Sequence, residues 1–203
     1  MKRFLFVALI VSLFVAAAAG SAFAGGATDN IQYRQSGVQA SAWWVDVNEE
    51  DASYTYTDVW VVKDQKTGLV DVMLSSYDGE NSTFGYLQTK EPVFTHNKNG
   101  DTAVLSAIVP VETWNSTGVT SGTKAINITW TATGGSSKEM HKYKQNDDYR
   151  VKSMVILQNT PATASGTIDG ISYTDGYGDI TSFKSLFFIK GYVPYPPDPG
   201  PVG

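Results

Sequence analysis

The sequence predicts an exported, all-β protein, and three observations lead to that prediction. The N-terminus has the pattern of a secretory signal peptide. Apolar and polar residues alternate with period two along most of the remaining chain, and turn-forming residues separate the alternating segments at roughly regular spacing. We expect about nine or ten strands in a single antiparallel β-sandwich. A β-barrel is the alternative, because strand order cannot be seen in a sequence.

The N-terminal segment predicts export. Lys2 and Arg3 form a short positive region, residues 4–19 are apolar except for Ser12, and the segment ends in the A-x-A motif Ala22-Phe23-Ala24. The apolar run is shorter than the roughly 20 residues that a membrane-spanning helix needs. We therefore expect a signal peptide over residues 1–24, cleavage after Ala24, a secreted or cell-surface protein, and no membrane span after cleavage.

The charge balance of the mature chain disfavours some classes of partner. The 203 residues carry a formal net charge of −5, and loss of Lys2 and Arg3 with the signal peptide would make it −7. This acidic balance disfavours nucleic acids and anionic membranes as partners, because both carry negative charge. The basic segment 138–144 is interpreted as a solvated strand face. The sequence contains no cysteine, so disulfides are excluded.

Alternation identifies the expected strands and the core of one domain, residues 25–192. Asp169-Gly170, which lies between two alternating segments, is the strongest hairpin signal, because both residues tolerate the positive φ of a type I′ turn. The expected core residues are those on the apolar side of their strands: Leu105, Val109, Ile126, Ile128, Trp130, Val155 and Leu157. Residues 193–203 are rich in proline and are expected to form a disordered tail.

No catalytic residue can be assigned from motifs. Nucleophilic catalysis needs a nucleophile, a base and an orienting group, and the two histidines, His96 and His141, lie in ordinary polar segments. Paired carboxylates have no local motif, so a secreted hydrolase that uses them stays open as an alternative. The candidate clusters lie in expected loops and are Glu49-Glu50-Asp51, Asp78 with Glu80, Asp147-Asp148, and Asp175 with Asp179.

Calcium is the one cofactor for which the sequence offers candidates. Asp175 and Asp179 flank a glycine-rich expected loop, where carboxylates and backbone carbonyls together suit a hard cation. The segment 78–81 is a second candidate. Neither matches the EF-hand pattern, and ordinary turn chemistry accounts for both.

Aromatic residues supply the candidate ligand-binding site. Tyr54 and Tyr56 are expected to share one strand face, and Trp114, next to the polar segment 115–117, is the best candidate for an exposed tryptophan. Trp43 and Trp44 must point to opposite faces, so at least one of them meets a core. Exposed rings of this kind bind sugars by stacking, whereas most aromatic residues pack in cores. We interpret Tyr54, Tyr56 and Trp114 as ligand-binding residues.

The order of three segments resembles a known group of proteins. These are the tryptophan-containing segment 41–45, the Tyr/Thr segment 54–59, and Trp130-Thr131-Ala132-Thr133-Gly134 followed by a polar strand rich in Lys and Tyr. The order resembles that of a group of uncharacterised secreted bacterial β-proteins. The resemblance implies export and an all-β fold, and it implies no activity or site residue.

Two classes of function follow. The favoured class is a non-enzymatic secreted or cell-surface protein that binds a glycan or another extracellular partner, or has a structural role, because Tyr and Trp give large rigid contact areas while Ser, Thr and Asn supply adaptable hydrogen bonds. The alternative is the secreted hydrolase.

Overall fold

The computed structural model describes residues 30–48, 53–146 and 150–190. These residues form one antiparallel sheet of ten strands, so the prediction of an all-β antiparallel fold with nine or ten strands is confirmed. No helix in the described part of the chain has the length and apolar character needed to cross a bilayer. The expected signal peptide and the proline-rich tail lie outside the described residues.

The ten strands follow one another along the chain. They are β1 (Asn30–Asn48), β2 (Ser53–Asp64), β3 (Val70–Tyr77), β4 (Ser82–Thr89), β5 (Phe94–His96), β6 (Thr102–Asn115), β7 (Gly118–Ala132), β8 (Ser137–Asn146), β9 (Arg150–Ile168) and β10 (Ile171–Lys190).

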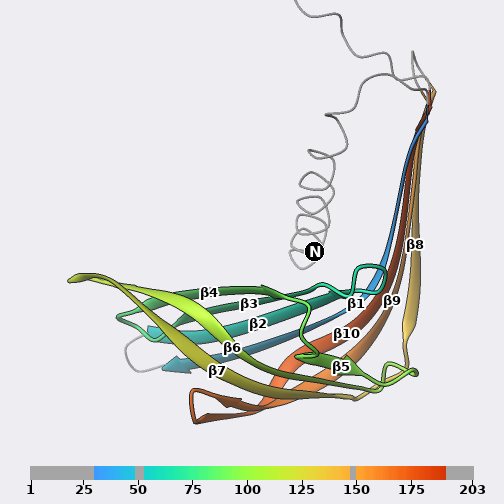
Figure 1. Ribbon diagram of the computed structural model, residues 1–203. Coiled ribbons are helices and arrows are strands. Elements are labelled where there is room, and N and C mark those ends of the chain that lie inside the picture. Colours follow the sequence, from blue (N-terminus) through green and yellow to red (C-terminus); the bar gives the residue numbers. More distant parts are fainter. Residues whose placement is uncertain (1–29, 49–52, 147–149, 191–203) are drawn as a thin grey trace, which may run out of the picture.

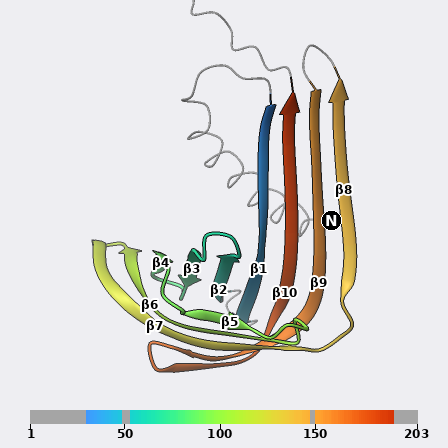
Figure 2. The ribbon, with the colours of Figure 1, turned by 45° about the vertical axis from the view of Figure 1, so that its right-hand side comes forward.

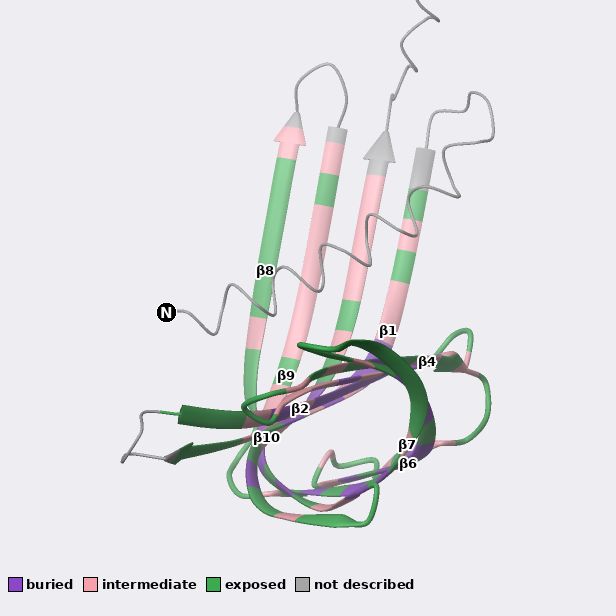
Figure 3. Ribbon diagram, turned by 90° about the vertical axis from the view of Figure 1, so that its left-hand side faces the viewer, coloured by how far each residue is buried: buried purple, intermediate pink, exposed green. Residues whose placement is uncertain are grey.

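Eight of these strands close on themselves. The hydrogen-bonded order β10-β1-β2-β3-β4-β6-β7-β9 is completed by pairing between β9 and β10, so the sheet curls into a ring whose walls face each other across one core (Figure 3). We call this part the ring. The short strand β5 pairs with β6 outside this order, and β8 pairs with β9.

Four strands continue past the ring as an open extension, which we call the arm. It consists of residues 30–36 of β1, 184–190 of β10, 150–159 of β9, and all of β8, which lie side by side in that order (Figure 2). The arm rises steeply from the ring, which gives the described chain the shape of an L (Figure 1). β2 begins to pair with β1 only at Gly37, and this is where the ring starts.

Alternation places the core inside the ring. Trp130 is fully buried there, its indole Nε1 donates a hydrogen bond to the Ser41 carbonyl oxygen at 2.6 Å, and its ring meets Phe94 edge-on. The core residues of β6 and β7 alternate along their strands as the sequence predicts: Leu105, Val109, Ile126, Ile128 and Trp130 are all buried. The prediction of these five core residues is confirmed.

Two core predictions are wrong. Val155 and Leu157 are only half-buried, because both lie on the part of β9 that belongs to the arm. The alternation in this segment is real, but no second wall of strands faces it among the described residues. A period-two pattern identifies which residues share a face and does not show whether that face is covered.

Close packing at the junction requires a glycine. A side chain at Gly37 would collide with the Lys63 carbonyl oxygen and with the Phe183 ring, which lies over the point where β1 leaves the arm.

The predicted hairpin turn is also confirmed. Asp169 and Gly170 have φ angles of 54° and 82°, and they connect the paired residues Ile168 and Ile171.

Candidate functional site

The ring carries an exposed aromatic cluster on its outer surface. Tyr56 of β2 lies directly opposite Tyr77 of β3, and Tyr54 lies two residues away on the same face. The ring centroid of Tyr54 is 6.4 Å from that of Tyr56 and 5.6 Å from that of Tyr77, and the centroids of Tyr56 and Tyr77 are 6.3 Å apart. These distances fall within the range of favourable aromatic pairs. The hydroxyl of Tyr77 donates a hydrogen bond to the Gly79 carbonyl oxygen at 2.7 Å, which fixes its orientation.

Trp114 belongs to the same face. Tyr77 pairs with Ser82 of β4, and Ser82 pairs with Trp114 of β6, so these residues and Tyr56 form one row across four strands. With neighbouring strands about 4.8 Å apart, the row from Tyr56 to Trp114 is roughly 14 Å long. Tyr54 is 52% exposed and Trp114 is 38% exposed, so both can meet a ligand. We call Tyr54, Tyr56, Tyr77 and Trp114 the aromatic row.

The sequence-based site residues are therefore brought together, and one member was missed. Tyr54 and Tyr56 share a face, as expected, and Trp114 is exposed. Tyr77 was missed because its place depends on the pairing of β3 with β2, which no local pattern reveals. Other exposed apolar residues continue the same face onto neighbouring strands: Trp43, Val45, Val47, Phe84 and Tyr86. Contiguous exposed apolar surface is a common feature of binding sites.

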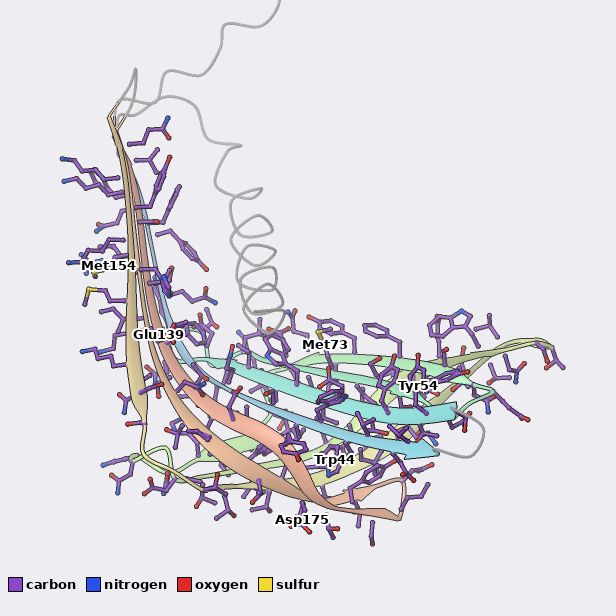
Figure 4. All side chains as sticks on the ribbon, turned by 180° about the vertical axis from the view of Figure 1, so that it is seen from behind. Trp44, Tyr54, Met73, Glu139, Met154 and Asp175 are labelled. Carbon is purple, nitrogen blue, oxygen red and sulfur yellow. The ribbon has the colours of Figure 1, made fainter. Side chains whose placement is uncertain are left out.

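Trp43 and Trp44 of β1 lie on opposite faces of the sheet. Trp44 packs against the core, with its ring centroid 5.1 Å from that of Tyr173, whereas Trp43 is 44% exposed on the outer surface. The expectation that the two rings point to opposite faces is confirmed. The labelled side chains in Figure 4 show Trp44 below the strands and Tyr54 near the end of the ring that is distant from the arm.

A carboxyl group lies beside the aromatic row. Asp58 is two residues from Tyr56 on β2 and directly opposite Trp43 and Ser75 on the two neighbouring strands. Burial raises the pKa of Asp58 to about 6. A second carboxyl of the outer surface, Asp179 of β10, also has a raised pKa because of burial, partly offset by hydrogen bonds from Thr181 and Ser41.

The backbone positions of these two carboxyls are farther apart than the carboxyl groups of a glycosidase pair. Asp179 pairs with Ser41, Ser41 pairs with Trp60, and Asp58 is two residues further along β2. Two strand spacings and two residue rises place their Cα atoms about 12 Å apart. The carboxyl pair of a glycosidase lies about 5–9.5 Å apart.

The calcium candidate Asp175–Asp179 is not a loop. Both residues belong to β10, and the expectation of a loop there is wrong. A bulge between Tyr173 and Gly176 interrupts the pairing with β9, and Asp175 has a positive φ of 54° at this point. Four residues of strand place their Cα atoms about 13 Å apart, a wide separation for two ligands of one ion. The described residues include no group of three or more metal-ligating side chains.

The second calcium candidate is a turn stabilised by its own side chains. The Asp78 carboxylate accepts hydrogen bonds from the backbone N–H groups of Glu80 and Asn81, and from the Asn81 side chain. These bonds lower the pKa of Asp78. The Asp78 carboxylate thus stabilises the turn by accepting hydrogen bonds from it, which is a common role of Asp in turns. The clusters 49–51 and 147–148 lie outside the described part of the chain.

The two histidines each contact a near neighbour in the sequence, and an open pocket lies on another part of the ring. His96 Nδ1 lies 3.0 Å from the Asn97 carbonyl oxygen, to which it donates a hydrogen bond, and His141 lies 3.4 Å from Glu139 on the arm. A wide pocket of about 530 Å³ lies where β4 and β6 diverge, between Leu87, Val93 and Ile108. Glu91 is the one ionisable residue among those that line it.

Known proteins provide no identification. No family model matches the sequence, and no curated protein is significantly similar to it. The function must therefore be inferred from the geometry of the outer surface.

Proposed function

We propose that the protein is a non-enzymatic, secreted or cell-surface binding protein whose aromatic row holds a carbohydrate. The observation that carries this proposal is the gathering of Tyr54, Tyr56, Tyr77 and Trp114 on one exposed face. Flat rings in a row match the apolar faces of successive sugar units, and the ordered strands below hold them in place. Rigid aromatic side chains lose little conformational entropy when they bind.

The polar neighbours favour an uncharged, hydroxyl-rich ligand. Asp58 and Ser75 lie opposite each other, two residues along their strands from Tyr56 and Tyr77. At the other end of the row, near Trp114, the Asn115 side-chain nitrogen donates a hydrogen bond to the Asn81 side-chain oxygen at 3.3 Å. Carboxyl and amide groups can accept and donate hydrogen bonds to sugar hydroxyls. None of these four neighbours is a Lys or Arg that would pair with an anionic ligand. A neutral polysaccharide fits this combination better than a sulfated or phosphorylated one.

Binding of neutral polysaccharides by purified protein tests the proposal. We expect Tyr54→Ala and Trp114→Ala each to weaken binding about tenfold or more, because a few aromatic residues dominate the energetics of most binding sites. Tyr143→Ala is the matched control: Tyr143 is 55% exposed and Tyr54 is 52% exposed, but Tyr143 lies on β8 in the arm. Equal losses in the Tyr54 and Tyr143 variants, with folding intact, would contradict the proposed site.

Activity assays on the same purified protein test the alternative that it is a hydrolase. A panel of glycosidase, esterase and protease substrates should give no turnover with the wild-type protein. Turnover that disappears in Asp175→Asn with Asp179→Asn, or in Asp58→Asn with Asp179→Asn, would replace the binding proposal by an enzymatic one. Loss of binding in the Tyr54 and Trp114 variants without turnover supports the proposal.

A further inference from the structure

The arm has two chemically different faces. Side chains on a strand alternate between faces, and the pairing register shows which positions of the four strands share one. One face carries six exposed basic residues: Arg34, Lys138, Lys142, Lys144, Lys152 and Lys184. We call it the basic face. The opposite face carries Tyr33 and Phe187, and it continues past Phe183 into the outer surface of the ring.

The basic face has no acidic partner among the described residues of the arm. Glu139, the one acidic residue of β8, is on the opposite face, next to His141. Lys144 and Lys152 lie directly opposite each other on the basic face. Like charges in such positions destabilise a sheet. The described residues of the arm thus offer these lysines no acidic partner, and an anionic ligand would supply the compensating charge.

Apolar side chains occupy the centre of the basic face. Met154 and Ile156 of β9 and Leu186 and Phe188 of β10 are half-buried, and Met140 of β8 is 47% exposed. Figure 4 shows Met154 on the side of the arm that points away from the aromatic row, among side chains with terminal nitrogen atoms. The face therefore combines an apolar centre with a basic surround.

Protection of a free edge does not account for all of these lysines. Among the described strands β8 pairs only with β9, and lysines on such edges prevent pairing with other chains. Edge protection accounts for Lys138, Lys142 and Lys144. It does not account for Lys152 and Lys184, because β9 and β10 are inner strands with partners on both sides.

We propose that the basic face of the arm docks on a bilayer surface that contains anionic lipid headgroups. Lysine and arginine meet the headgroups, and the apolar centre enters the boundary between headgroups and acyl chains, which is the pattern of interfacial membrane binding. A soluble polyanion would match the charge but would leave the apolar centre unused. The acidic remainder of the chain then points away from the membrane, and the aromatic row faces the surrounding medium.

Binding to vesicles tests this proposal. The form to use is the chain from residue 25, the expected mature form, which contains every described residue. We expect it to bind vesicles of phosphatidylcholine with phosphatidylglycerol, to bind pure phosphatidylcholine much more weakly, and to lose binding at high salt. Lys142→Gln with Lys144→Gln and Lys152→Gln should weaken binding about 100-fold, at roughly fivefold per lysine.

Two further variants distinguish a lipid surface from a soluble polyanion and from an effect of net charge alone. Lys66→Gln with Lys90→Gln and Lys98→Gln changes the net charge equally, in connections between strands outside the basic face, and should leave vesicle binding unchanged. Met140→Ser should weaken binding to anionic vesicles and leave any retention by an anionic polymer, such as heparin, unchanged. Equal binding to both kinds of vesicle, equal effects of the two triple variants, or retention by heparin without vesicle binding would each overturn the proposal.

Discussion

The ring and the arm are built from the same strands and differ in what covers them. On β1, the positions that share the face of Arg34 continue through Val38, Ala40 and Ala42, which are buried in the core of the ring. A face that is exposed and basic in the arm therefore becomes the interior of the protein without any change of alternation. Closure of the sheet, and not strand pattern, decides which half of such a strand forms a core.

The largest expected effect contrasts two leucines. Leu105→Ala removes a fully buried side chain in the ring and should lower the free energy of unfolding by about 2–5 kcal/mol. Leu157→Ala removes the same atoms from the half-buried face of the arm, and about 1 kcal/mol is expected there. Urea titration of both variants provides the comparison. Similar losses at the two sites would mean that the arm is covered as completely as the ring.

A second contrast concerns buried and exposed charge. Because the pKa of Asp58 is about 6 in the folded protein, against 3.8 ordinarily, the folded state binds more protons than the unfolded state between about pH 4 and pH 6. Stability should therefore fall as the pH rises through this window. Asp58→Asn should raise the free energy of unfolding at pH 7, on the order of 1–3 kcal/mol, and flatten this part of the pH profile.

An arm lysine is the control for this measurement. Lys152→Gln changes an exposed charge and should alter the free energy of unfolding by less than about 0.5 kcal/mol at any pH in the window. Thermal melts at several pH values check both variants. A pH profile that is unchanged in Asp58→Asn would show that this carboxyl is solvated in the folded protein.

The smallest expected effect concerns calcium. Asp175 and Asp179 lie four residues apart along one strand of the ring, so added calcium or chelator should leave the melting temperature unchanged. Differential scanning fluorimetry is sufficient for this measurement. An increase with calcium that disappears in Asp179→Asn would restore the metal site that the sequence suggested.

The sequence predicted those features that depend on local pattern. Alternation identified the buried residues of β6 and β7, and the Asp169-Gly170 turn and the shared face of Tyr54 and Tyr56 were also local. Features that depend on pairing over long distances were missed. Tyr77 joins the aromatic row through register, and Val155 loses its core position because no described strand faces it.

Net charge does not describe how charge is distributed over the surface. An overall charge of −5 argues against anionic surfaces only if the charges are mixed, and the described arm instead holds six exposed basic residues on one face. This separation becomes visible only when four strands from three parts of the chain are placed side by side. Composition records the sum of the charges, whereas a partner meets their local arrangement.

The bulge at Asp175 changes which side chains of β10 point inward. Tyr173 faces the core before it, and Gly176, Gly178 and Ile180 face the core after it, so the chain changes from odd to even inward positions within three residues. Without that extra residue, Ile180 would point out of the ring and Lys184 would join the aromatic side of the arm. One residue in the ring thus determines which face of a distant strand segment is basic.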